Sequence, residues 1–223
     1  MSAARQLPLP FAHRPEFAAA DLVAAPSNAA ARAWLDRTAD WPGLRLALFG
    51  QAGAGKTHLL HLWAAARGAA LWPGPGLRGI DPMAVPAAGV AIDDADTAPD
   101  PVLFLHLLNA AAAAGRPVLL AARTAPARWA TALPDLASRL RAVTAVEIGP
   151  ADEALLRALL TRLLAARQLD VVDPVQAFLL LHLPRTPGAL REAVARLDRA
   201  ALGQGRGVTR TLAAEVLAEM ESG

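Results

Sequence analysis

Short apolar runs alternate with longer stretches of helical periodicity over the first two thirds of the chain. Each run is short enough for a buried strand, and together they cover residues 44–49, 90–92, 118–121 and 143–148. Strands that alternate with helices in this way form a parallel, doubly wound sheet with crossover helices. The pattern therefore predicts an α/β domain over residues 21–150.

After residue 150 the pattern changes to helices alone. Asp173 and Thr186 each precede a proline, an arrangement that suits a capping side chain before the first residue of a helix. Apolar residues recur at helical spacing over residues 151–166, 174–183, 187–202 and 212–221. We expect a small all-helical lid domain over residues 151–223.

Composition supports a globular protein with a sizeable core, since 54% of the 223 residues are hydrophobic. No stretch reaches the roughly 18 uncharged residues of a membrane span. Residues 1–5 lead into no apolar signal region, so we expect a cytoplasmic protein with no membrane partner. The chain has no cysteine, which excludes disulfides and thiolate metal sites.

The isoelectric point of about 10.2 overstates the basic character of the chain, because the formal net charge is only +2. Almost no group titrates between histidine and arginine, so a small positive excess moves the isoelectric point far upward. Long basic runs and arginines interleaved with aromatic residues are both missing from the sequence. These observations argue against direct nucleic-acid binding.

A complete phosphate-loop motif, G-x-x-x-x-G-K-[ST], follows the first predicted strand and precedes a predicted helix over residues 57–66. It contains the only lysine of the chain, and its residues are Gly50, Gln51, Ala52, Gly53, Ala54, Gly55, Lys56 and Thr57. Backbone amides of such a loop turn toward a β-phosphate, and the helix N-terminus adds partial positive charge. The motif predicts a site for ADP or ATP, against the alternative of an ordinary Gly-rich turn.

Three residues at this site have specific expected roles. Lys56 would reach the β- and γ-phosphates, and Thr57 would offer its hydroxyl to Mg²⁺. His58 directly follows the motif and is included among the candidate nucleotide-binding residues. His58 and His61 also have a spacing that suits a metal, but packing is the favoured role because no third ligand is apparent.

Paired carboxylates end the predicted strand at residues 90–92. Asp93 would hold Mg²⁺ and Asp94 would orient an attacking water, as in a Walker B element. A solvated acidic strand end is the alternative, and the phosphate loop upstream makes it less favourable. Together the two motifs predict an α/β P-loop domain with a nucleotide at the carboxyl ends of its strands.

A P-loop core followed by a helical lid resembles the AAA+ class. Segments 26–28, 55–61 and 133–140 are similar to the DnaA family of bacterial replication initiators and, more closely, to its small Hda-like regulators. The similarity covers nearly the whole chain. It implies that Arg139 is an arginine finger that acts on a neighbouring subunit's nucleotide. The alternative is a surface arginine that caps a helix or pairs with Asp135.

Residues 1–20 are rich in Pro and Ala, lack periodicity, and are expected to form an extended N-terminal arm. The arm contains a hexapeptide similar to the motif with which Hda-like proteins bind the β sliding clamp of DNA polymerase III, namely Gln6, Leu7, Pro8, Leu9, Pro10 and Phe11. Prolines keep such a segment extended, while Leu9 and Phe11 can fill an apolar pocket. The alternative is an arm that packs on its own domain.

The resemblance implies a regulator that binds ADP or ATP, docks on the clamp and promotes hydrolysis of the ATP held by DnaA. DNA would be a partner only indirectly, through the clamp. The chain departs from the family pattern at the two sensor positions, where Ala121 to Thr124 follow the third predicted strand and Ala189 lies in the third lid helix. Arg185 and Arg191 are nearby in the sequence but are expected on other faces. These departures predict weak intrinsic hydrolysis.

Two other functions remain open. One is an autonomous AAA+ ATPase such as a helicase-loader-like protein, and the other is a clamp-binding adaptor with a vestigial nucleotide site. The oligomeric state also remains open, with a homodimer among the alternatives.

Overall fold

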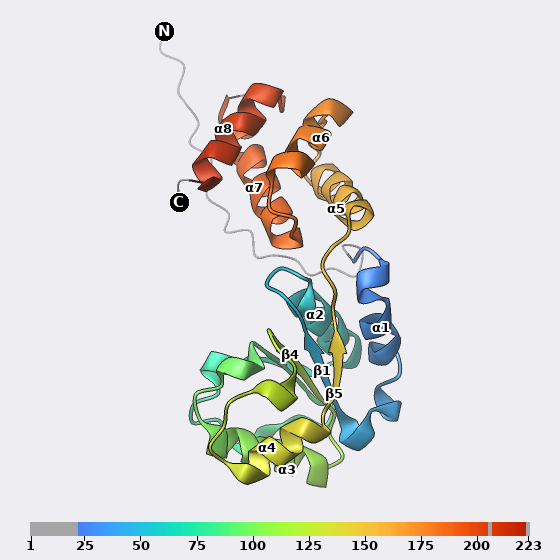
Figure 1. The fold of residues 1–223 in the computed structure, drawn as a ribbon, viewed down its shortest axis with the longest axis vertical. Coiled ribbons are helices and arrows are strands. Elements are labelled where there is room, and N and C mark those ends of the chain that lie inside the picture. The colour runs from blue at the N-terminus through green and yellow to red at the C-terminus, as the bar shows by residue number, and fades with distance from the viewer. Residues whose placement is uncertain (1–21, 205–206, 222–223) are drawn as a thin grey trace.

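The computed structural model describes residues 22–204 and 207–221 and shows an elongated molecule (Figure 1). The α/β part contains five strands, which are β1 (Arg45–Phe49), β2 (Ala70–Pro73), β3 (Val90–Asp93), β4 (Val118–Ala122) and β5 (Thr144–Glu147). Its α-helices are α1 (Pro26–Leu35), α2 (Lys56–Arg67), α3 (Pro101–Ala113) and α4 (Pro134–Ala142). Helices α5 (Glu153–Ala166), α6 (Asp173–His182), α7 (Pro187–Gln204) and α8 (Arg210–Glu221) follow and lie above the sheet in Figure 1.

The five strands form one sheet in the order β2-β3-β4-β1-β5, and every pairing is parallel. The carboxyl ends of all strands therefore meet at one edge, which is where a doubly wound sheet binds ligands. The predicted class, a parallel α/β sheet followed by helices, is confirmed.

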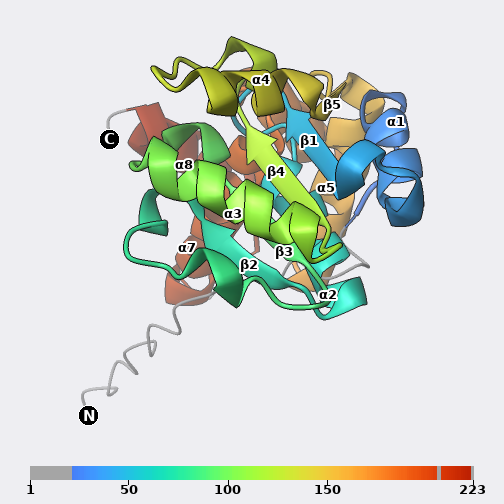
Figure 2. The ribbon, with the colours of Figure 1, turned by 90° about the horizontal axis from the view of Figure 1, so that it is seen from below.

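Alternation along the strands explains why helices cover both faces of the sheet. Leu46 and Leu48 of β1 pack with α1 and α2, whereas Ala47 packs with α3 and α4. In β4, Leu119 and Leu120 divide between the two faces in the same way. Because successive side chains of a strand point to opposite faces, a strand buried on both sides is a continuous apolar run. Figure 2 shows α3 running across one face of the sheet.

The helical part has a core of its own. Its buried residues are mainly leucines at helical spacing on α5, α7 and α8, for example Leu160, Leu190 and Leu197, which are fully or almost fully buried. Thr186 caps α7 through a hydrogen bond that its Oγ1 accepts from the Ala189 amide, at 3.2 Å. Val23, which precedes α1, packs against this helical core.

Strand β2 was not predicted, because its four residues, Ala70–Pro73, are only partly buried at the sheet edge and end in a proline.

The hexapeptide Gln6–Phe11 lies outside the described residues, so its role stays a prediction. Within the part of the chain that the structure describes, no helix is long and apolar enough to cross a membrane.

Candidate functional site at the carboxyl edge of the sheet

The phosphate loop connects the end of β1 to the start of α2, and two of its glycines are required by local geometry. A Cβ at Gly50 would collide with the carbonyl oxygen of Ile148. Gly53 has φ of +77°, and a Cβ there would lie 3.0 Å from the Cβ of Thr186 in the lid. The loop is therefore packed between the neighbouring strand end and the lid, and a larger residue at either position would displace its amides.

Lys56 points back across the loop. Its Nζ donates hydrogen bonds to the carbonyl oxygens of Gly50 and Gln51, each at 2.8 Å. An ammonium has three donors, so one N–H remains for a phosphate oxygen. Burial lowers the pKa of Lys56, and the charges of Asp93, Asp94 and Asp96 partly oppose this effect. The cation and the carboxylates therefore share one electrostatic environment.

Thr57, Asp93 and Asp94 occupy positions that fit Mg²⁺ and water. Thr57 is in the first turn of α2, and Asp93 ends β3 at the same sheet edge. Hydroxyl and carboxylate oxygens are the hard ligands that Mg²⁺ prefers, with phosphate and water completing its shell. Asp94 is exposed and adopts φ of +47°, a backbone strain often found at functional turns. Thr97 Oγ1 donates to the Asp94 carbonyl at 2.6 Å and supports this turn.

Arg123 lies at the same edge, directly after the two buried alanines that end β4. Its backbone amide donates to Asp96 Oδ2 at 3.1 Å, and its charge contributes, after burial, to lowering the pKa of Lys56. Sequence reasoning noted this segment only as a departure from a family pattern. The structure instead brings an arginine near the phosphate end of the site, and arginines there can contact a γ-phosphate.

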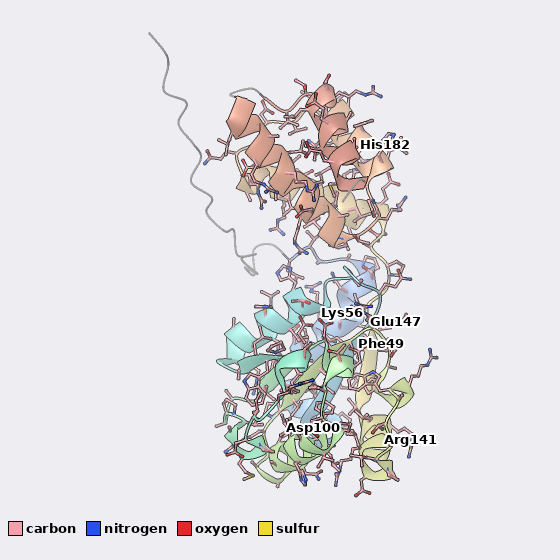
Figure 3. All side chains as sticks on the ribbon, turned by 90° about the vertical axis from the view of Figure 1, so that its left-hand side faces the viewer. Phe49, Lys56, Asp100, Arg141, Glu147 and His182 are labelled. Carbon is pink, nitrogen blue, oxygen red and sulfur yellow. The ribbon has the colours of Figure 1, made fainter. Side chains whose placement is uncertain are left out.

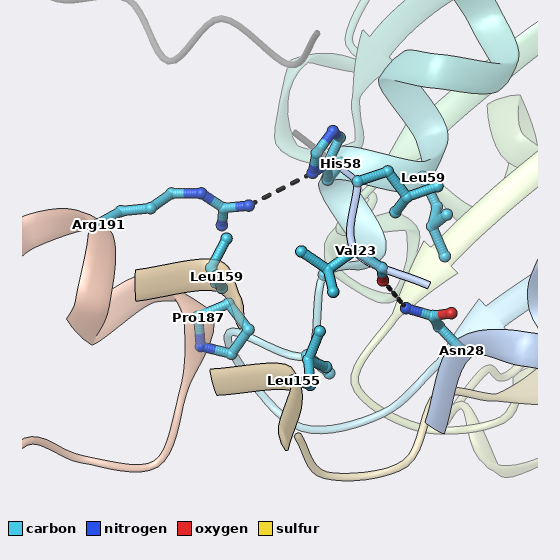
Figure 4. Close-up of a pocket in the computed structure, with 11 residues that line it drawn as sticks. Val23, Asn28, His58, Leu59, Leu155, Leu159, Pro187 and Arg191 are labelled. Carbon is cyan, nitrogen blue, oxygen red and sulfur yellow. Dashed lines mark hydrogen bonds between the residues drawn. The ribbon is translucent and has the colours of Figure 1, made fainter. Parts of the chain in front are cut away.

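The lid closes over the loop. A small cavity of about 30 Å³ lies between them, with room for one or two waters but not for a purine base. Its lining comes from the segment before α1, from the loop and α2, and from the lid, namely Leu22, Val23, Asn28, Ala54, Gly55, His58, Leu59, Leu155, Leu159, Pro187 and Arg191 (Figure 4). A nucleotide base would enter this cavity only after α5 and α7 shift relative to α2.

Two hydrogen bonds organise the cavity (Figure 4). Arg191 Nη2 lies 3.3 Å from His58 Nδ1 and joins α7 to α2. Asn28 Nδ2 donates to the Val23 carbonyl at 2.9 Å and fixes the segment before α1. The expectation that Arg191 lies on another face was wrong, because the lid packs directly on the phosphate loop. Arg185 does point elsewhere, since it pairs with Glu153 at 3.7 Å within the lid.

Arg139 lies far from this site. It is on α4 next to Arg45, which begins β1 at the amino edge of the sheet. Figure 3 shows Lys56 close to the lid and Arg141, two residues beyond Arg139, toward the other end of the molecule. Among the described residues Arg139 forms no ion pair or hydrogen bond, so it does not pair with Asp135.

Solved structures share this fold. Domain III of the Thermotoga maritima replication initiation protein DnaA matches with a TM-score of 0.73 and 18% identity, over 92% of this chain and 97% of that one. AMPPCP-bound DnaA from Aquifex aeolicus has a TM-score of 0.67 and 18% identity, over 86% and 68%. The Thermotoga maritima RuvB Holliday junction branch migration motor matches with a TM-score of 0.60 and 16% identity, over 78% of this chain and 61% of that one.

These likenesses show that the chain shares the fold of these proteins. A scan against protein-family models found no match, and a search of curated proteins found no relative.

The sequence did not indicate most of the lid side of the site. Leu155, Leu159 and Pro187 are ordinary apolar and turn residues whose spacing predicts only a helical core. These residues lie about 100 positions or more after the loop in the sequence, and no local pattern indicates that they line the same cavity as the loop. The one available clue was the arginine pair Arg185 and Arg191 near the start of α7.

Proposed function

We propose that this protein is an Hda-like regulator of chromosome replication initiation. It binds adenine nucleotide with Mg²⁺ at Gly50–Thr57, docks on the β sliding clamp through Gln6–Phe11, and presents Arg139 to the ATP held by DnaA. Two DnaA structures among its structural neighbours hold AMPPCP, which supports an adenine nucleotide as the ligand. Hydrolysis on DnaA would then switch the initiator off.

The position of Arg139 carries this proposal. Arg45 and Gly50 are at opposite ends of β1, which separates them by about 16 Å at 3.3 Å per residue. Arg139 lies beside Arg45, so its side chain cannot reach the phosphates of its own chain. Arg139 has no ion-pair or hydrogen-bond partner among residues 22–204 and 207–221, and it lies on the far side of the sheet from its own phosphate loop. Such an arginine is suited to act in trans, where it stabilises charge developing on a γ-phosphate.

The decisive experiment compares Arg139→Ala with Arg141→Ala, a matched variant of an exposed arginine on the same helix. ATP hydrolysis by DnaA is measured with clamp loaded on DNA. Arg139→Ala should reduce the stimulated rate by about 10³-fold or more, the lower end for arginine fingers. Arg141→Ala should retain the rate within about threefold. Full stimulation by Arg139→Ala would remove the trans-acting role and leave the clamp-binding adaptor as the better account.

An autonomous ATPase is the second candidate, and Arg123 is the observation that favours it. The charge of Arg123 acts on Lys56 of the chain's own site, and its backbone amide donates to Asp96 Oδ2. Substantial ATP turnover by the purified protein, lost in Arg123→Ala and unchanged by added DnaA, would support this function. Turnover that stays very slow without DnaA would support the regulator.

A further inference from the structure

A cavity of about 310 Å³ lies at the amino edge of the sheet, between the start of β1 and α4. Its lining residues are Arg45, Asp135, Ser138, Arg139 and Ala142. The cavity is large enough for a tetrahedral oxyanion and opens to solvent. It is separate from the nucleotide site, which lies at the other end of β1.

Each of the two arginines that line this cavity carries an unsatisfied donor. The Nε atoms of Arg45 and Arg139 are buried and have no hydrogen-bond partner within the described part of the chain. Buried N–H groups of this kind are rare in folded proteins, and each one implies a ligand, a water or a partner that completes it. Two such groups on residues that line one cavity favour a shared acceptor that both guanidinium groups can contact.

The charges agree with an anionic ligand. Burial lowers the pKa of Arg45, and the nearby positive charge of Arg139 lowers it further. Asp135 is the one carboxylate that lines the cavity, and it forms no ion pair with either arginine among the described residues. The cavity therefore keeps a net positive charge, and the Ser138 hydroxyl adds a further donor.

A phosphate fits these donors better than a single carboxylate does. Two guanidinium forks from different elements, β1 and α4, can grip different oxygens of a tetrahedral group, whereas one planar carboxylate is satisfied by one fork. The chain's own phosphate loop lies about 16 Å away along β1, so such a phosphate would belong to another molecule.

We propose that Arg45 and Arg139 form a single two-arginine oxyanion site that receives the terminal phosphate of a nucleotide held by a neighbouring molecule. The inference rests on the proposed function for the identity of that neighbour. It adds Arg45 as a second phosphate ligand, which no motif in the sequence indicated.

The first test needs no partner protein. Inorganic pyrophosphate is titrated into full-length Lys56→Ala protein, in which the phosphate loop is weakened, and the arginine Nε–Hε signals are followed by NMR. The signals of Arg45 and Arg139 should shift together with one dissociation constant, while that of Arg141 stays in place. Adding Arg45→Gln should weaken the response of Arg139 at least tenfold. No shift at Arg139, or a shift unaffected by Arg45→Gln, would overturn the site.

The second test measures association with DnaA loaded with AMPPCP or with ADP. Arg45→Gln should weaken binding to the AMPPCP form at least fivefold and leave binding to the ADP form unchanged. Arg45→Lys, which keeps the charge, should recover part of the lost binding. Such recovery would show that the loss in Arg45→Gln does not come from misfolding. Equal weakening of both forms would mean that the arginines contact carboxylates of the partner, and the phosphate assignment would be wrong.

The two tests separate the inference from the proposed function. If Arg139→Ala keeps full stimulation of DnaA, the function fails while the pyrophosphate titration still decides the site. If Arg139→Ala loses stimulation but Arg45→Gln behaves as wild type in both tests, the function stands and the two-arginine site fails.

Discussion

At the scale of single residues, Lys56 is the cation on which nucleotide binding depends. Lys56→Ala should weaken ADP binding at least tenfold, about 1.4 kcal/mol, because a charged hydrogen bond to phosphate is lost. Isothermal calorimetry measures the change. Arg67→Ala, at the other end of α2, is the matched control and should bind as wild type. Equal affinities of wild type and Lys56→Ala would remove the phosphate-loop assignment.

Arg123 should contribute to the choice between ATP and ADP. Its charge acts on Lys56 from the end of β4, where the γ-phosphate of a bound ATP would lie. Arg123→Ala should weaken ATP binding by about tenfold, about 1.4 kcal/mol, and ADP binding much less. The ratio of the two dissociation constants is the measurement, and exposed Arg128 in the next turn provides the control. An unchanged ratio would place Arg123 outside the site.

At the scale of elements, the contact between the phosphate loop and the lid depends on Gly53. Gly53→Ala would be strained at φ +77° and would also press on Thr186, whereas Gly115→Ala would have comparable strain, at φ +63°, with open space around it. Both variants should unfold at lower temperature than wild type. Gly53→Ala should lose about 1 kcal/mol more than Gly115→Ala. Equal losses would mean that the lid does not press on the loop in solution.

The N-terminal arm should behave as a separate binding element. Replacing Gln6, Leu9 and Phe11 with Ala should abolish binding to the clamp, because an extended linear motif binds through those side chains. The thermal unfolding midpoint and the ADP dissociation constant should stay close to wild type. Surface plasmon resonance on immobilised clamp and a thermal melt measure the two effects. A large fall in the midpoint would instead favour an arm packed on its own domain.

At the scale of the whole molecule, local sequence patterns predicted most of the strands and helices. Each of these elements is a contiguous segment, and its own apolar pattern indicates which of its residues are buried. The runs at β1, β3 and β4 are buried on both faces and need no distant information. β5 is an edge strand in which only Val146 is buried, but the buried residues Val143 and Ile148 flank it and complete its apolar run. The sequence pattern did not predict β2, because β2 is a short, half-buried strand at the edge of the sheet. The phosphate loop and Asp93 could likewise be found from contiguous motifs.

Contacts between distant segments could not be predicted. The Arg191–His58 hydrogen bond joins residues 133 positions apart, and the Arg45–Arg139 pair joins the first strand to the fourth helix. Each depends on how the lid or α4 packs on the sheet, and no local periodicity encodes that packing. Without knowledge of that packing, the positions of the arginines in the sequence do not show which of them lie close together. These tertiary contacts form the two charged sites, one at the carboxyl edge of the sheet and the other at its amino edge.

The sites at the two edges of the sheet should act independently on ligand binding, because they lie about 16 Å apart along β1 and share no partner among the described residues. At ADP near 100 times its dissociation constant, wild type should gain about 2.7 kcal/mol of stability against unfolding. Arg139→Ala should keep that gain in full, since its guanidinium lies at the far edge of the sheet. At the same ADP concentration Lys56→Ala should gain about 1.4 kcal/mol less, the equivalent of tenfold weaker binding. Chemical denaturation with and without ADP measures all three proteins. A reduced gain in Arg139→Ala would show that the amino edge and the phosphate loop are coupled through the sheet, and the resident nucleotide would then control the arginine that acts on the partner.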